Sequence, residues 1–567
     1  MTSQLSFKRW KRVGGAVFAT ALIGALTPAV AASAHPAHGH GSCDKRTNNT
    51  FTKLLDCVSA EGALKHERAL QRIADRSDDP TYPGSRAAGT DGYADSVDYV
   101  SRTLRKAGWK VALDPVEIQF VLPSELRQLT PVSADYETGT FTGSGDGVVE
   151  GQVVPVDLSL DPPRESTSGC EPSDFAGLDF NGDADIALVQ RGACNFGDKA
   201  KNAEDAGAEA VIIFNQGNSP DREGLIVANA STLGDGSSVT HGIPVVGATF
   251  ADGVALAQTG STAYVEVPPI ETRTDYNVIA EKKGKNRDNV VMAGAHLDSV
   301  TEGPGINDNG SGSAALLELA QAMRKLKPQN TVRLAWWAAE EQGLVGSEDY
   351  VAGLSESDRD EIAAYLNFDM VASPNFIYGV YDADESSFEA PVPVPAGSEA
   401  LEDLFETFFT WQEIPYEDSE FSGRSDYQAF INSDIPSSGL FTGAEVPKTE
   451  EQEAIWEGVA GESYDPCYHQ ACDSLESDEA AGRDAAVYGE LRAENDLVGN
   501  ISLEALGVNS DAIAFAMLSL AYSTEDVNGV RGKKVPGSAS LGLPEEFAGP
   551  EGTAGSDGGH GPAGHDS

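Results

Sequence analysis

Apolar residues recur along this chain with two different spacings, and the spacing predicts which segments are helices and which are strands. Repeats of three and four residues predict helices at 63–74, 93–107, 199–206 and 312–326. Short apolar runs between turn residues predict strands at 110–113, 148–156, 186–190, 210–214, 243–247, 277–281, 289–295, 331–337 and 363–367. From residue 277 strands and helices alternate, which predicts a mixed, mostly parallel sheet flanked by helices, an α/β fold.

The spacing of apolar residues and the frequency of turn residues change along the chain and divide it into segments. We expect folded stretches at 43–135, 136–268 and 269–530, because the middle stretch is rich in short strands and in turns containing Gly and Asp. Residues 35–42 are predicted to be a flexible His-rich leader, and residues 531–567 a disordered tail rich in Gly, Pro and acid. At 567 residues, the chain is also too long for one ordinary core.

The first 34 residues have the pattern of a secretory signal. An apolar run at 14–26 precedes a small-residue cleavage site that ends at Ala34, and it follows the basic residues Lys8, Arg9, Lys11 and Arg12. A membrane anchor is the competing interpretation, but the run is short for a span and is interrupted by Thr20. We therefore expect cleavage near Ala34, export of the mature protein and no membrane span.

The net charge of the chain limits the classes of partner that it can bind. A formal net charge of −50 argues against binding nucleic acid or anionic lipid. Solubility outside the cell or tolerance of salt is the simpler explanation for so many carboxylates.

The six cysteines fall into three close pairs, and an even number in an exported chain favours disulfides. Six cysteines allow 15 connectivities. Pairing between sequence neighbours is the expected one: Cys43 with Cys57, Cys170 with Cys194, and Cys467 with Cys472. A zinc site at Cys467, His469 and Cys472 is the alternative, and oxidising surroundings disfavour it.

Four of the nine histidines lie in the body of the chain, and the other five lie in the tails. His66 falls on the polar side of a predicted helix, so we expect it to be exposed. His241 precedes a turn, and we assign it no role. His296 and His469 remain as candidates for chemistry.

Polar side chains follow three of the predicted strands at the point where each strand ends. His296 follows 289–295, Glu340 and Glu341 follow 331–337, and Asp369 follows 363–367. Ligand sites of open α/β sheets form in the crevice at these carboxyl ends. Asp308 lies in a Gly-rich turn just before the helix at 312–326.

Each of these residues also has an ordinary structural explanation. Asp308 could be a turn former or helix cap, Asp298 a surface charge, and the Glu340–Glu341 pair a solvated face. Their coincidence at strand ends, together with His296 and His469, favours a metal site.

Imidazole and carboxylate are the ligands of catalytic zinc, and five such side chains suffice for two ions. Asp308 is the best candidate to bridge the ions, with His296 and Asp369 completing one site and Glu341 and His469 the other. Glu340 then stays free as a general base. Asp298 would accept the other imidazole N–H of His296 and fix its tautomer. Cobalt or manganese could replace zinc in vitro.

At these residues the chain resembles the secreted bacterial di-zinc aminopeptidases of the aminopeptidase Y type. The resemblance covers about 43–135 and 268–525. Its motifs are His296-x-Asp298, residues 305–312, residues 340–347, Asn367-x-Asp369, Tyr468-His469-x-x-Cys472-Asp473, residues 423–427 and residues 439–445. Asn309 departs from relatives that have Asp there, but Asn309 is not needed as a ligand.

The resemblance implies a zinc exopeptidase fold, two Zn²⁺ ions held as above, and Glu340 as the base. It also implies that Tyr468 donates a hydrogen bond to the tetrahedral oxyanion. Glu340, Asp369 and the backbone near Arg424 would hold the free α-amine of a peptide. The family often has a cis peptide after the bridging Asp. The expected enzyme is a monomer that releases N-terminal, preferentially hydrophobic residues from peptides.

Residues 186–208 resemble a protease-associated domain. We expect this domain to be inserted into the peptidase, to be linked by Cys170 and Cys194, and to act as a lid or substrate-selecting wall.

Three other functions remain as alternatives. A glutamate-carboxypeptidase-like exopeptidase shares the metal set, but it needs cationic side chains for the substrate carboxylate, and Arg424 is the one obvious candidate. A non-catalytic receptor resembling transferrin receptors would lack an intact metal site. Glutaminyl cyclisation needs only one zinc.

Overall fold

The structure is a computed structural model that describes residue 43, residues 45–182 and residues 184–541. The predicted signal sequence and leader lie outside the described residues. So do residues 542–567 of the predicted tail.

A mixed eight-stranded sheet forms the centre of the larger lobe, and this confirms the predicted fold class. Its strand order is β1-β9-β11-β10-β12-β15-β13-β14. The strands β10, β11, β12 and β15 run parallel to one another, whereas β1 and β9 pair antiparallel at one edge. The bounds are β1 Lys110–Phe120, β9 Glu271–Lys282, β10 Asn286–His296, β11 Asn330–Trp337, β12 Ile362–Phe368, β13 Gly379–Tyr381, β14 Glu417–Ser419 and β15 Ser437–Phe441.

Helices pack on one face of this sheet around the largest apolar core. They are α2 Ala60–Ala74, α3 Asp91–Lys106, α6 Gly312–Ala322, α9 Ser398–Gln412 and α14 Leu503–Tyr522. Hydroxyl side chains cap several of them; Thr90, for example, accepts a hydrogen bond from Tyr93 N at the start of α3. Among the described residues, α14 alone is long and apolar enough to cross a membrane, and 78% of its most apolar window is buried. Its composition is that of a core helix.

The opposite face of the sheet carries a second, aromatic core. The helices α7 Val345–Gly353 and α10 Tyr427–Ile431 cover it. The rings of Tyr365 and Phe430 stack there with centroids 3.6 Å apart. Burial on both faces explains why β10, β11 and β12 read as nearly continuous apolar runs.

Short elements complete the larger lobe. They are α1 Phe51–Leu55, α8 Glu356–Asp360, α11 Glu450–Trp456, α12 Asp478–Ala481, α13 Ala485–Glu494, α15 Glu525–Asn528, β16 Leu497–Val498, β17 Ile501–Ser502, the π-helix η3 Ile306–Ser311 and the 3₁₀ turn η4 Ser538–Ser540.

A seven-stranded sheet forms the smaller lobe, in the order β3-β2-β8-β4-β5-β6-β7. The helices α4 and α5 pack on opposite faces, each over its own apolar cluster. The bounds are β2 Glu125–Thr130, β3 Ala134–Tyr136, β4 Gly147–Pro155, β5 Asp185–Gln190, β6 Ala210–Phe214, β7 Val245–Ala248, β8 Thr262–Val267, α4 Phe196–Ala206, α5 Phe250–Leu256, η1 Pro172–Phe175 and η2 Pro220–Arg222.

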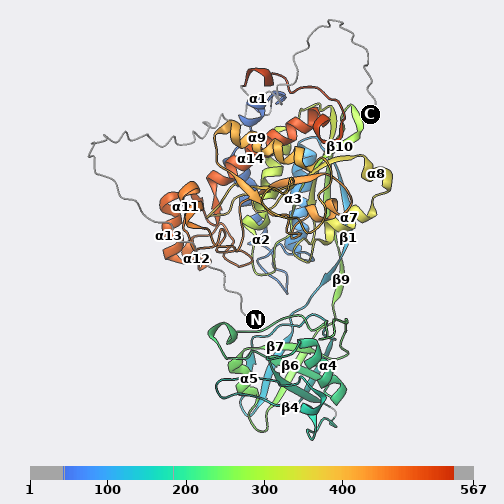
Figure 1. The fold of residues 1–567 in the computed structure, drawn as a ribbon, viewed down its shortest axis with the longest axis vertical. Helices are drawn as coiled ribbons and strands as arrows, with labels where there is room; N and C mark the ends of the chain where they lie inside the picture. The colour runs from blue at the N-terminus through green and yellow to red at the C-terminus, as the bar shows by residue number, and fades with distance from the viewer. Residues whose placement is uncertain (1–42, 44, 183, 542–567) are drawn as a thin grey trace, which may run out of the picture.

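The antiparallel pair β1 and β9 links the two lobes (Figure 1). Lys110 pairs with Glu281 in the larger lobe, and the register continues to Phe120 opposite Glu271. The strand predicted at 110–113 is therefore much longer in the structure, because β9 supplies backbone partners along its whole length.

Residues 531–541, which we predicted to be part of a disordered tail, are ordered against the body. Val535 is buried in the main core, and Trp411 Nε1 donates to Leu541 O at 3.1 Å. The polar, Gly-containing composition of this segment does not reveal these contacts.

Candidate metal centre

The candidate ligands gather at the carboxyl ends of three neighbouring strands. His296 ends β10, Glu340 and Glu341 follow β11, and Asp369 follows β12. Because β10 lies between β11 and β12 in the sheet, these side chains converge on one point. Asp308 comes from η3, which leads directly into α6.

The carboxylate of Asp308 lies between two histidines. Its Oδ1 is 3.1 Å from His296 Nε2, and its Oδ2 is 3.4 Å from His469 Nε2. His296 Nε2 is also 3.3 Å from Asp369 Oδ1, and His469 Nε2 is 3.1 Å from Glu341 Oε2. Two three-residue clusters therefore share the two oxygens of one carboxylate.

These distances fit zinc ligation. Two ligand atoms bound about 2.0–2.1 Å from a tetrahedral zinc lie about 3.3 Å from each other. In the described part of the chain, His296 Nε2, Glu341 Oε1 and Asp369 Oδ1 are buried without a hydrogen-bond partner. Buried polar atoms are rarely left unpaired, so a group that accepts lone pairs fits between them.

The protonation of the cluster also fits a metal site. Burial and the negative charge of Asp308 raise the pKa of Glu341 to about 8. Burial alone would lower the pKa of His469, but contacts with Asp308 and Glu341 raise it to about 10. The protons held here are those that a divalent cation would replace.

Glu340 and Asp298 lie beside the two clusters. Glu340 Oε2 is 3.9 Å from His296 Nε2, and burial raises the Glu340 pKa well above its usual range. The carboxylate of Asp298 accepts hydrogen bonds from the backbone N–H groups of Glu340 and Glu341, at 3.1 and 3.3 Å. His296 Nδ1 lies 3.6 Å from Asp298 Oδ1 and 3.2 Å from Asp298 O. Asp298 thus braces both His296 and the two glutamates.

Comparison with known proteins places this site in a family. Residues 277–488 match peptidase family M28, and residues 149–256 match the PA domain. An aminopeptidase of Pseudomonas aeruginosa is 46% identical over 486 residues, which span 84% of this chain and 83% of that protein. The chain belongs to peptidase family M28.

Two further relatives bear on the M28 assignment. Leucine aminopeptidase 2 of Trichophyton rubrum is 42% identical over 361 residues, which span 63% of this chain and 65% of that protein. The structure of a zinc aminopeptidase from Bacillus subtilis has a TM-score of 0.56 and 26% identity, and it covers 81% of this chain and 94% of that one. The larger lobe is thus an M28 aminopeptidase fold, and the smaller lobe contains a PA domain.

A buried network holds the bridging position of this M28 peptidase. The carboxylate of Asp473 accepts hydrogen bonds from the backbone N–H groups of Asn307 and Asp308, at 2.9 and 3.0 Å. Asn500 Nδ2 donates to Asp473 and to Asp465, and Asn307 Nδ2 also donates to Asp465. The Asp308–Asn309 peptide is cis, as the resemblance implied. Asp465 and Asn500 could not be identified from the sequence, because their partners lie far away along the chain.

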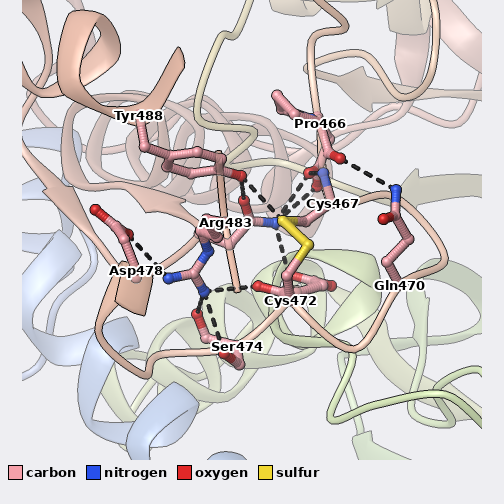
Figure 2. The surroundings of a disulfide bond; sticks show 12 residues. Pro466, Cys467, Gln470, Cys472, Ser474, Asp478, Arg483 and Tyr488 are labelled. Carbon is pink, nitrogen blue, oxygen red and sulfur yellow. Dashed lines mark hydrogen bonds and ion pairs between the residues drawn. A yellow bond between two sulfur atoms is a disulfide. The ribbon is translucent and has the colours of Figure 1, made fainter. Parts of the chain in front are cut away.

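The loop that carries His469 is fixed at both ends (Figure 2). The disulfide between Cys467 and Cys472 closes it, and Tyr488 Oη lies 3.2 Å from Cys467 Sγ. Arg483 Nη2 donates to Cys472 O and Ser474 O. The structure also forms the other two expected disulfides, Cys43–Cys57 and Cys170–Cys194.

Tyr468 and Arg424 lie together at the rim of the site. Arg424 Nη2 donates to Tyr468 Oη at 3.1 Å, and Arg424 Nη1 is 2.7 Å from Glu445 Oε1. The ring of Tyr468 stacks on His469 with centroids 3.8 Å apart. The structure therefore places every candidate catalytic, ligand and substrate residue around one centre.

The two remaining body histidines are buried away from it. The prediction that His66 is exposed was wrong, because α2 packs against both α3 and α6. His66 Nδ1 is 2.7 Å from Tyr99 Oη, and Nε2 is 2.6 Å from Gln321 Nε2. His241 Nε2 lies 3.0 Å from Ala230 O inside the PA domain lobe.

Proposed function

We propose that this protein is a secreted aminopeptidase with two zinc ions, which removes N-terminal, preferentially hydrophobic residues from peptides. The observation that carries the proposal is the position of Asp308, whose two oxygens face two separate histidine–carboxylate clusters. A single-zinc site would leave one of these clusters unused.

His296 and Asp369 would hold one ion, Glu341 and His469 the other, and Asp308 would bridge them. Zinc bound there would polarise the scissile carbonyl and lower the pKa of a nucleophilic water. Glu340 Oε2 would take the proton of that water and pass it to the leaving amine. Glu340 suits this role because it is buried beside the ligands and forms no ion pair with Lys or Arg in the described part of the chain.

Tyr468 would donate its O–H to the developing oxyanion. Asp298 would keep the His296 imidazole and the Glu340 backbone in place, which makes it a positioning residue.

The charge around the site favours an aminopeptidase over a carboxypeptidase. The free α-amine would bind near Glu340, Asp369 and the backbone at Arg424. The guanidinium of Arg424 is already paired with Glu445, so it is not free to clamp a substrate carboxylate. A preference for apolar residues is supported by the name of the Trichophyton relative, a leucine aminopeptidase.

Export and the domain organisation complete the proposal. Three disulfides suit an oxidising compartment, as does the signal-like pattern up to Ala34. The expected boundary at residue 136 falls too late, because β2 and β3 pair within the smaller sheet. We therefore assign residues 43–120 and 271–541 to the peptidase domain and residues 121–270 to the PA domain lobe.

The test uses one peptide in three forms, with its N-terminus free, with the N-terminus acetylated, and with the C-terminus amidated. The protein is stripped of metal with a chelator and then reconstituted with zinc. Zinc-dependent release of the first residue from the free and amidated forms, but not from the acetylated form, is the expected result. Cleavage of the acetylated form, with loss of cleavage on amidation, would instead identify a carboxypeptidase.

A further inference from the structure

A cavity of about 210 Å³ lies directly beside the metal centre and has no role in the chemistry described above. It shares Glu341 and Asp298 with that centre. Its other walls come from three loops: Ala87 and Ala88, residues 299–302, and Gln342. Pockets for drug-sized ligands are about 300–1,000 Å³, so this one suits a single side chain better than a cofactor.

The walls of the cavity are fixed in place before any ligand binds. The buried guanidinium of Arg86 donates to three carbonyls of the loop, those of Leu297, Pro304 and Gly305. Ser299 Oγ accepts from Arg86 N at 3.0 Å. Asp298 in turn fixes the start of the Glu341–Gln342 segment through its backbone N–H bonds. A pre-formed cavity loses little conformational entropy when a ligand enters.

The order of the strands indicates which part of a peptide reaches the cavity. Asp369 follows β12 and Glu341 follows β11, on opposite sides of β10. Under the proposed function, the free amine is held by Glu340, Asp369 and the backbone near Arg424, and none of these three residues lines the cavity, whereas Glu341 does. The chain beyond the scissile bond is therefore placed on the side of the cavity.

The charge of the lining indicates which side chain it accepts. Three of the lining residues are acidic, Asp298, Glu302 and Glu341, and no Lys, Arg or His is among the lining residues in the described part of the chain. Asp298 is occupied by backbone N–H groups, and Glu341 is a proposed ligand. Glu302 is exposed, and its carboxylate accepts a hydrogen bond from the hydroxyl of the neighbouring Thr301 at 3.1 Å.

We propose that this cavity binds the side chain of the residue after the scissile bond, and that Glu302 selects Lys or Arg there over Asp or Glu. The proposal rests on the proposed aminopeptidase function. It names a substrate class for that function: peptides whose second residue is basic.

The experiment compares three peptides, Leu-Lys-Ala-amide, Leu-Ala-Ala-amide and Leu-Glu-Ala-amide, with leucine anilide as a substrate that has no second residue. The zinc-loaded full chain is expected to cleave the Lys peptide with the highest kcat/KM and the Glu peptide with the lowest. An exposed ion pair changes binding by up to about fivefold, so the Lys-to-Ala ratio should be of that size and should shrink at high salt.

Two variants and a control test whether Glu302 causes the preference for the Lys peptide. Glu302→Gln should bring the three peptides to similar kcat/KM values, and Glu302→Lys should favour the Glu peptide. Both variants should hydrolyse leucine anilide as the unmodified chain does. Glu356→Gln, on the exposed start of α8, should change none of these ratios.

The outcomes separate the two proposals. Equal cleavage of the three peptides by the unmodified chain, or a Lys preference that survives Glu302→Gln, would overturn the cavity assignment while leucine anilide is still hydrolysed. Failure to hydrolyse leucine anilide and all three peptides would overturn the proposed function, and this inference with it.

Discussion

Arg424 donates a hydrogen bond to Tyr468, with Nη2 and Oη 3.1 Å apart. Because the guanidinium fills one lone pair of the phenol oxygen, the O–H of Tyr468 must point elsewhere. Glu445 holds the other side of the guanidinium at 2.7 Å. The pair therefore orients a hydrogen-bond donor at the rim of the metal centre.

Replacing Tyr468 with Phe should lower kcat about 100-fold, because an oxyanion donor is lost. Arg424→Ala should lower kcat less, and in the Tyr468→Phe background it should have little further effect. Steady-state kinetics of the two single variants and the double variant would measure this coupling. Additive losses would mean that Arg424 acts independently of Tyr468.

Replacing Glu340 with Gln should lower kcat about 10²- to 10⁴-fold, because a general base is lost, while bound zinc is retained. Activity assays and elemental analysis would be run on the same preparation. Glu348→Gln, on the exposed side of α7, is the matched control and should behave as the unmodified chain does. A fully active Glu340→Gln variant would exclude this residue as the base.

The purified protein should contain two zinc ions per chain, and a chelator should abolish its activity. His469→Ala should retain about one ion, because Glu341 and Asp308 alone hold the second site poorly. Asp369→Asn should weaken the other ion instead. Elemental analysis after dialysis distinguishes these cases, and one ion in the unmodified chain would contradict the bridging role of Asp308.

Removing the Cys467–Cys472 disulfide with a double Ser substitution should weaken zinc binding at His469 by about tenfold, as loss of groups that support a ligand typically does. Arg483 still donates to the backbone carbonyls of residues 472 and 474, so the chain should remain folded. Zinc titration followed by activity gives the apparent affinity. The Cys170–Cys194 double Ser variant, whose disulfide lies in the other lobe, should keep the original affinity.

Asp511 should make the protein less stable as the pH rises. Burial and the nearby charge of Asp56 raise its pKa to about 8, and its Oδ1 has no hydrogen-bond partner in the described part of the chain. An unfolded Asp has a pKa of about 3.9, so between about pH 4 and 8 the folded state holds a proton that the unfolded state has released. Stability is therefore lost through that window.

The Asp511→Asn variant should remove this pH dependence. Its Tm should exceed that of the unmodified chain by a few degrees at pH 9 and differ little near pH 4. Thermal melts across this range would measure the difference. An equal Tm difference at both pH values would show that Asp511 does not titrate as described.

The sequence predicted the centre of the fold better than its edges. β10, β11 and β12 are nearly continuous apolar runs with His, Glu or Asp at or just after their ends. The positions of the strands and of the metal clusters could therefore both be predicted from the sequence. The strands β13, β14 and β15 were missed. Two of them have only three residues, too few for a recognisable period.

Contacts made by tertiary structure could not be predicted in the same way. His66 lies on a helix face that is polar in sequence yet covered by two other helices. The guanidinium of Arg424 contacts Glu445 and Tyr468. Neither partner lies near it in sequence, so no local pattern could identify them.

The pairing of Phe120 with Glu271 brings the entry and exit of the PA domain lobe together at adjacent backbone positions. The lobe is thus an insertion at the tip of a β-hairpin. Its 150 intervening residues, 121–270, could be exchanged for a two-residue turn without moving either end of the hairpin. The smaller lobe of this M28 peptidase is therefore a module that could be shortened, replaced by another domain or transferred to another hairpin.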